Sequence, residues 1–423
     1  MRRYVFVSAP IATRRTYATA GASLLLLLIA PARARADGWS ASPTEGVRWT
    51  SSSGEVALHA GGVYAGDLVL HDSDNASSSG LRTDLAKPIV DGTYRGAWRL
   101  RIAGDLEGTK TAANVYEAFV AWQGLPWLRI SAGLLQLPLG FEAGTRPEDL
   151  ALVGHSFSYF MDYRTDWALR VEGELVEGVF DWDVAWAVGD GFDASGETQR
   201  GSQLSARGFV RPLRALSGPD ASFLESLAAG FFLGGGYAYT WDWDGRLRIR
   251  NPAGTRLFDS QRFEADESQF YTLSAGFEVG PVRLYYEGTQ GGYFDAETPV
   301  GVRDLDNQTD SWHATLSWRI TGEPYDGRSF HERELAPLGP NAWEVALRYA
   351  NGDIDRDFFA FGLTDDSISS QEFRSTSLAL NWYATPNLRI SAEFVRTQAD
   401  DDIASLGFQG DDQAGILRAQ YRF

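Results

Sequence analysis

The feature that most constrains this chain is an alternation of apolar and polar side chains with a period of two residues. It recurs in residues 94–107, 167–175, 180–188, 312–320, 343–349 and 417–423. A period of two places successive side chains on opposite faces of a β-strand, whereas a helix would scatter them around its axis. Each segment is close to the roughly 10 residues that a tilted strand needs to cross a bilayer. The alternation therefore predicts an all-β fold.

A soluble β-sandwich alternates as well, so further features must separate it from a membrane barrel. Aromatic side chains lie at the ends of the apolar faces, where a barrel places its interfacial girdles. Tight turns are expected at 124–126, 280–281 and 385–387, and long connections at 292–308, 352–371 and 399–412. This asymmetry is typical of barrels that span a membrane. We therefore predict a transmembrane antiparallel β-barrel.

The strand count follows from the same pattern. Candidate strands cover 55–66, 93–107, 113–123, 127–136, 164–176, 178–189, 203–211, 229–240, 268–279, 281–290, 309–321, 341–350, 372–384, 387–397 and 413–423. Single-chain bacterial barrels normally have an even number of strands. We therefore expect about sixteen, with one strand missed or merged in 47–70 or 104–114.

The first 36 residues have the pattern of a secretory signal peptide. Arginines precede an apolar run at residues 24–30, and Ala34-Arg35-Ala36 has the small residues of a cleavage site. The run is shorter than the about 20 residues that span a bilayer, although an N-terminal anchor remains the alternative. The domains are therefore predicted as a leader, 1–36, and an outer-membrane barrel, 37–423.

Charge and composition narrow the function. The chain carries 38 basic and 56 acidic residues, and six of the basic residues lie in the leader. A chain this acidic is a poor nucleic-acid binder, because binding to phosphate needs a basic surface. The sequence has no cysteine, which fits an exported protein without disulfides. No apolar run after Ala36 is long enough for a membrane helix, so a membrane location requires a barrel.

Five segments resemble a known family in that family's order. They are residues 128–142, 317–323, 342–349, 380–389 and 418–423. These segments are similar to the phosphate-selective porins O and P. The resemblance implies a sixteen-stranded trimeric porin without cofactors, whose lumen is narrowed by inward-folded loops. It also implies that arginines and lysines line the path of phosphate or other small anions.

The chain departs from this pattern, because Lys87 and Lys110 are its only lysines. Arginine also binds phosphate, through a planar fork, but the two residues are not interchangeable. Alternation gives these pore-lining selectivity candidates: Arg95, Arg99, Arg101, Arg129, Arg170, Arg283, Arg319 and Arg348. Nearly as many acidic residues share the lumenal face. The alternative is therefore that these charges pair across strands and only hydrate a wide channel. Arg95, Arg99 and Arg101 would stack on one strand face.

Two further segments have predicted roles. The loop 137–163, which begins with Leu137-Pro138-Leu139-Gly140, is expected to fold inward as the constriction, with Glu142, Arg146 and Glu148 as its candidate site residues. The chain ends on Tyr421-Arg422-Phe423, which resembles the assembly signal of outer-membrane proteins. We expect the terminal strand to close the barrel.

Three further function classes have weaker support. Gly154-His155-Ser156-Phe157-Ser158 begins like a nucleophile elbow but lacks the closing glycine, so a barrel-embedded hydrolase stays a minor possibility. A non-conducting adhesin-type barrel and a general or cation-tolerant porin would show the same alternation.

The five histidines show no metal-ligand spacing. Asp353-x-Asp355-x-Asp357 is better explained as a solvated loop than as a cation site. We therefore predict neither an enzyme nor a metal protein.

Overall fold

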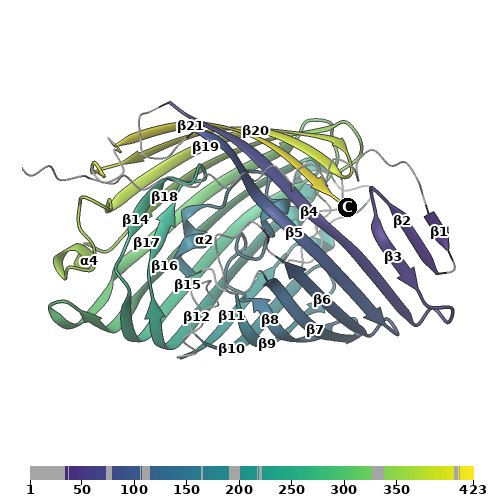
Figure 1. Cartoon of the computed structure of the whole chain (residues 1–423), viewed down its shortest axis with the longest axis horizontal. Coiled ribbons are helices and arrows are strands. Elements are labelled where there is room, and N and C mark those ends of the chain that lie inside the picture. Colours follow the sequence, from purple (N-terminus) through teal and green to yellow (C-terminus); the bar gives the residue numbers. More distant parts are fainter. Residues whose placement is uncertain are drawn as a thin grey trace, which may run out of the picture.

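The computed structural model describes residues 34–36, 38–72, 79–104, 106, 115–162, 165–189, 201–216, 218, 222–325, 338–403, 408 and 410–423. Sixteen strands form a closed antiparallel barrel in which sequence neighbours pair and the last strand pairs with the first. They are β4 (Val56–His71), β5 (Gly80–Tyr94), β6 (Trp98–Gly104), β7 (Val115–Leu125), β8 (Leu128–Gln136), β9 (Thr165–Val176), β10 (Phe180–Val188), β11 (Ser202–Val210), β12 (Phe231–Gly245), β15 (Phe263–Val279), β16 (Val282–Thr298), β17 (Gly301–Arg319), β18 (Ala342–Asp353), β19 (Glu372–Thr385), β20 (Leu388–Ala399) and β21 (Asp411–Arg422). The predicted barrel and its strand number are confirmed (Figure 1).

Side chains alternate between the two faces of the wall as the sequence predicts. In β19, Ser375 and Ser377 point inward and are buried, whereas Leu378 and Leu380 point outward and are exposed. An apolar outer face with a polar inner face inverts the arrangement of a soluble core. A barrel in lipid requires this inversion. Within the described residues, no helix is long and apolar enough to cross a membrane.

The strand that sequence reasoning missed is β5, and it lies outside both stretches where we expected it. The pairing of β5 with β4 shifts between Ala65 and Gly66, so β5 contains a bulge that breaks its alternation. The strand also contains Pro88, which supplies no amide hydrogen to the sheet. Both features hide β5 from a search for strict period two.

The predicted strand 93–107 is in fact a hairpin turn followed by β6. Tyr94 pairs with Trp98, and Arg95 and Gly96 between them have φ angles of +51° and +66°. The three-residue connection preserves the parity of the alternation, so the pattern continues across the turn. Arg95 therefore lies in the turn, and the predicted stack of three arginines on one strand face is wrong.

The two ends of the barrel differ in their connections. We call the end with tight connections, such as those after Tyr94 and Leu125, the turn end, and the opposite end the loop end. The predicted long loop 292–308 is wrong: β16 and β17 extend to a tight turn at 299–300. The turn end also carries η2 (Arg214–Leu216) and α3 (Phe223–Gly230), between β11 and β12.

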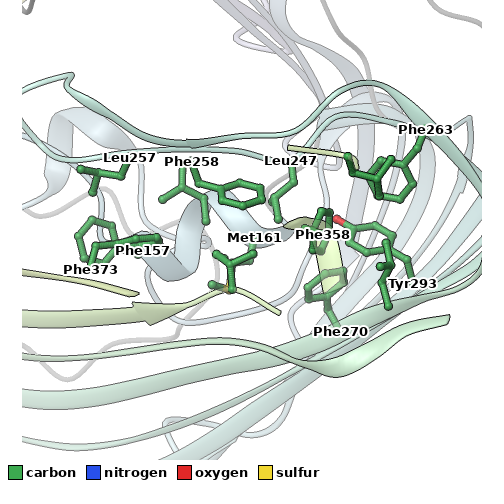
Figure 2. Packing of buried hydrophobic residues seen from close by; sticks show 14 of the residues in the cluster. Phe157, Met161, Leu247, Leu257, Phe258, Phe263, Phe270, Tyr293, Phe358 and Phe373 are labelled. Atoms are coloured by element: carbon green, nitrogen blue, oxygen red, sulfur yellow. The ribbon is translucent and has the colours of Figure 1, made fainter. Parts of the chain in front are cut away.

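At the loop end, several connections pack together through an aromatic cluster (Figure 2). The cluster joins α2 (Phe157–Asp162), the hairpin of β13 (Arg248–Arg250) and β14 (Arg256–Asp259), and α4 (Asp357–Ala360) to the barrel wall. Phe258 and Phe358 meet edge to face at 5.4 Å, and Phe157 meets Phe373 at 4.8 Å. Such pairs add about 0.5–1.5 kcal/mol each beyond simple burial. These connections therefore pack into one layer with an apolar core.

Three short strands extend the sheet beyond the barrel at the turn end (Figure 1). They are β1 (Ala34–Ala36), β2 (Trp39–Ser42) and β3 (Gly46–Thr50), and β3 pairs with residues 57–60 of β4. β1 lies inside the predicted leader 1–36, of which the remaining residues fall outside the described part of the chain. The cleavage after Ala36 therefore remains a prediction.

Candidate functional site

The connection between β8 and β9 folds into the barrel, where Figure 1 shows its helix α2 surrounded by strands. We call its described residues 137–162 the inner loop. Near its start, Phe141 is buried and stacks on Phe232 at 5.3 Å, and Tyr285 lies 4.6 Å away. The carbonyl of Leu139 accepts a hydrogen bond from Thr272, and the carbonyl of Gly140 accepts one from Arg207. An apolar anchor and wall donors therefore hold the loop from its first turn.

A second part of the inner loop is fixed by arginines of the wall. Arg348 of β18 pairs with Glu142 at 2.8 Å and donates to the carbonyls of Gly154 and His155. Its side chain is only 1% exposed. An arginine presents five donors in a fixed fork, so one residue can hold three loop positions at once.

The segment 148–153 is held by β19, β20 and β21. Arg389, Asn381 and Arg418 donate to the carbonyls of Leu150, Ala151 and Val153, respectively. Arg418 is itself paired with Asp67 of β4 at 2.8 Å, and both side chains are fully buried. Because the loop carbonyls have no regular secondary structure to bond, these wall donors satisfy them. We call β15–β21 with β4 the gripping wall.

On the opposite wall, β5–β9, which we call the open wall, several arginines of the inner face keep part of their exposure. Arg99, Arg129 and Arg170 retain 17%, 16% and 13% of their side-chain exposure. A cavity lies between this wall, β11 and the inner loop, and Glu117, Arg129, Arg146, Arg170 and Arg207 are its charged lining. The inner loop thus covers one wall and leaves a cavity with four arginines in its lining beside the other.

The arginines of the open wall are interleaved with carboxylates. Asp91 binds both Arg99 and Arg101 at 3.0 Å. Arg101 also binds Glu117, at 2.9 Å. On the next strands, Arg129 pairs with Glu172 at 3.1 Å, and Arg170 contacts Glu172 and Asp183. Cross-strand pairing therefore supplies the compensation that like charges on one strand need.

Comparison with known proteins identifies the architecture. The sequence model of the family Phosphate-selective porin O and P matches residues 89–423. The chain belongs to this family. Porin O of Pseudomonas aeruginosa is 23% identical over 369 residues, which cover 79% of this chain and 80% of that protein.

Solved outer-membrane channels share the fold of this porin. The channel DcaP of Acinetobacter baumannii superimposes with a TM-score of 0.53 at 12% identity and covers 89% of this chain and 99% of its own. OprB of Pseudomonas putida has a TM-score of 0.53 at 10% identity, covering 86% and 94%. These likenesses confirm the barrel.

The eight arginines predicted to line the pore have different positions in this porin. Arg99, Arg101, Arg129 and Arg170 lie on the inner face of the open wall, whereas Arg348 is buried beneath the inner loop. Arg95 is largely exposed in its turn, where it pairs with Glu55 at 3.1 Å. Arg283 and Arg319 flank the ring of Tyr325 near the turn end, 4.1 and 3.8 Å from its centroid.

The predicted constriction residues also have different positions. Arg146 lines the cavity, whereas Glu142 and Glu148 are buried in contacts with the wall. Burial raises the pKa of Glu148, but nearby Lys87, Arg146 and Arg422 outweigh it and lower that pKa to about 2. Glu148 is therefore an ionised anchor, bound to Lys87 at 3.3 Å.

Lys87 is a residue whose position sequence reasoning missed, because it lies on the unpredicted strand β5. Its ammonium group stands 3.7 Å from the ring centroid of Tyr116 as well as binding Glu148. The broken alternation around Pro88 removed the signal that would have placed Lys87 on the inner face.

The hydrolase hypothesis gains no support from the geometry. The hydroxyl of Ser156 donates to Glu142, and neither ring nitrogen of His155 has a hydrogen-bond partner among the described residues. His155 instead stacks on Tyr159 at 3.5 Å. A serine nucleophile would need the imidazole as its base.

The last residues of the sequence complete the barrel seam. Phe423 and Gly62 exchange two backbone hydrogen bonds, of 3.0 and 2.8 Å, which continue the pairing of β21 with β4. Tyr421 donates from its hydroxyl to the carbonyl of Pro43. The strand predicted to close the barrel does so, whereas the role of Tyr421 and Phe423 as an assembly signal stays a prediction.

Proposed function

We propose that this porin conducts small anions, phosphate among them, between the inner loop and the open wall. The observation that carries the proposal is the basic lining of that passage, with Arg129 and Arg170 on the wall and Arg146 on the facing loop. Guanidinium groups bind phosphate and other oxyanions through paired hydrogen bonds. The name of the family points to the same class of solute.

The interleaved carboxylates limit how selective the passage is. Asp91, Glu117 and Glu172 each bind an arginine of the open wall, so much of the positive charge is compensated. Selectivity depends on the charges at the narrowest part of a pore. We therefore propose moderate anion preference rather than strict phosphate specificity.

A general, cation-tolerant porin is the second candidate, and a specific observation favours it. A cavity of about 340 Å³ at the loop end is lined by acidic side chains, namely Asp242, Asp244, Glu264, Asp266, Asp295 and Glu297. Such a surface attracts cations to the loop end, most strongly at low ionic strength. The two candidates differ in whether the acidic loop end or the basic passage controls the current.

The reversal potential under a salt gradient, measured in a planar bilayer, separates these candidates. The wild-type porin should prefer anions, and Arg129→Ser with Arg170→Ser should move its reversal potential toward cations. Arg396→Ser is the control, because Arg396 is an exposed arginine paired with Asp411. A wild-type channel that prefers cations, and that the double change leaves unmoved, would establish the cation-tolerant porin.

We also propose that the leader 1–36 directs the chain to the outer membrane and that the mature barrel assembles as a homotrimer. The family and the barrel fold support an outer-membrane location. Chemical crosslinking of the purified protein tests the trimer, and N-terminal sequencing tests cleavage after Ala36. Deletion of Phe423 should leave export intact but reduce the folded barrel seen as a heat-modifiable band.

A further inference from the structure

Three side chains with metal-binding chemistry meet where the inner loop contacts the gripping wall. They are Glu142 of the loop, Glu287 of β16 and His313 of β17. One ligand atom of each lies within 4.8 Å of the others, and no side chain of the three is more than 2% exposed. The proposed conduction path uses none of them.

The surroundings of His313 leave one of its ring nitrogens available to a metal ion. Its Nε2 atom is buried and has no hydrogen-bond partner within the described residues, whereas its Nδ1 atom lies 3.4 Å from the hydroxyl of Ser158. The ring also meets Tyr285 edge to face at 5.5 Å. An imidazole that donates through one nitrogen presents a lone pair on the other, which is how proteins orient metal-binding histidines. A buried nitrogen without a partner costs stability unless a ligand meets it.

The charges around the cluster also favour a bound cation. Glu142 and Glu287 are both buried here, and Glu142 forms an ion pair with Arg348. Among the described residues, no lysine or arginine forms an ion pair with Glu287. The pair of Glu142 with Arg348 therefore leaves Glu287 as a buried carboxylate without a cationic partner in the described part of the chain. Uncompensated buried charge is strongly unfavourable, and a bound cation would offset it.

The hydrogen bonds to the two nearer carboxylates hold them in place. Glu142 accepts from Arg348 and Ser156, and Glu287 accepts from Ser274 and from the backbone amide of Phe141. A carboxylate oxygen has more than one lone pair, so these bonds orient the groups without preventing coordination. Outer hydrogen bonds of this kind are typical of metal sites.

We propose that Glu142, Glu287 and His313 bind one divalent transition-metal ion of the zinc type. A mixed set of imidazole nitrogen and carboxylate oxygen suits such an ion better than calcium or magnesium, which prefer oxygen alone. The ion would bridge the inner loop to β16 and β17. The site would therefore fasten the loop in place, independently of which solute the pore conducts.

Zinc content of the purified barrel tests this proposal. The protein is equilibrated with zinc chloride, passed over a desalting column and measured by mass spectrometry. Wild-type protein should retain about one zinc ion per chain, and Glu287→Gln or His313→Phe should weaken binding by at least about tenfold. Glu344→Gln is the matched control, because Glu344 is a buried wall glutamate bonded to Tyr325 and Tyr383 and lies outside the cluster.

Cobalt supplies a readout that does not depend on the variants folding. Wild-type barrel loaded with Co²⁺ should show visible absorption bands of a low-coordinate site with nitrogen and oxygen ligands. Absence of these bands, or zinc retention that is negligible in the wild type or equal in all four proteins, would overturn the proposal. Neither result bears on the reversal potential, so this proposal and that of anion conduction fail separately.

Discussion

The gripping wall and the open wall carry the same residue type on the same face, yet their arginines have different partners. Arg348 and Arg418 of the gripping wall are no more than 1% exposed and donate to carbonyls of the inner loop. Arg99 and Arg129 of the open wall keep part of their surface and pair with wall carboxylates. An arginine on the lumenal face therefore binds the loop where the loop covers it and stays partly exposed, paired with wall carboxylates, where the loop does not.

The largest effect should come from removing a clamp. Arg418→Ala leaves the fully buried Asp67 with only its longer contact to Arg82, at 3.5 Å, and breaking a buried pair costs about 3–5 kcal/mol. The free energy of unfolding, from urea titrations of the barrel in lipid, measures the loss. Arg129→Ala should cost less, because Glu172 keeps its contact with Arg170. Equal losses would remove the distinction between the walls.

On the outer face, substitutions in the gripping wall and in the open wall should have similar effects on stability. Leu347 of β18 and Leu169 of β9 point outward near the middle of their strands and are 43% and 49% exposed. Arginine at either position should destabilise the barrel by about 2–4 kcal/mol, the cost of placing that charge in the bilayer core. The same urea titration measures both variants. A variant that loses nothing would show that its position does not face lipid.

Acid should weaken the attachment of the inner loop to the wall, because Glu148 loses its negative charge. Its pKa in the folded protein is lowered from 4.5 to about 2. The stability it contributes is therefore present above about pH 4.5 and is lost as the pH falls toward 2. Unfolding midpoints measured between pH 7 and pH 2 should fall over this range. Glu148→Gln should make the decline shallower, and an unchanged slope would assign the acid sensitivity to other carboxylates.

The smallest effect is expected at Arg95, in the turn beside the open wall. Arg95→Gly removes an exposed ion pair worth at most about 1 kcal/mol and relieves a positive φ that glycine adopts readily. Neither the unfolding free energy nor the reversal potential should change measurably. Arg99→Ser, four residues further on, should shift the reversal potential toward cations. A shift with Arg95→Gly as large as that with Arg99→Ser would return Arg95 to the pore lining.

The sequence predicts the barrel because alternation is a local property that each strand displays by itself. It fails at β5, where a bulge shifts the alternation, and at Arg95, where a three-residue turn preserves it. The site is less predictable for a different reason. Alternation assigns Arg348 and Arg129 to the same face but does not show which of them the inner loop covers. Glu142, Glu287 and His313 lie far apart in the sequence, so only the folded loop brings them together.

The seam at Gly62 has a practical consequence for handling this protein. Phe423 bonds to Gly62 of β4. β3 pairs with the same edge of β4 at residues 57–60, so β3 and the end of the chain meet end to end along this edge. Gly61 lies between them, and a Cβ atom there would stand only 2.1 Å from the carbonyl oxygen of Phe423. A peptide tag appended after Phe423 would run along β4 directly into β3. Such a tag would have to displace β3 or bend away from the sheet, and either arrangement disturbs the junction that completes the barrel.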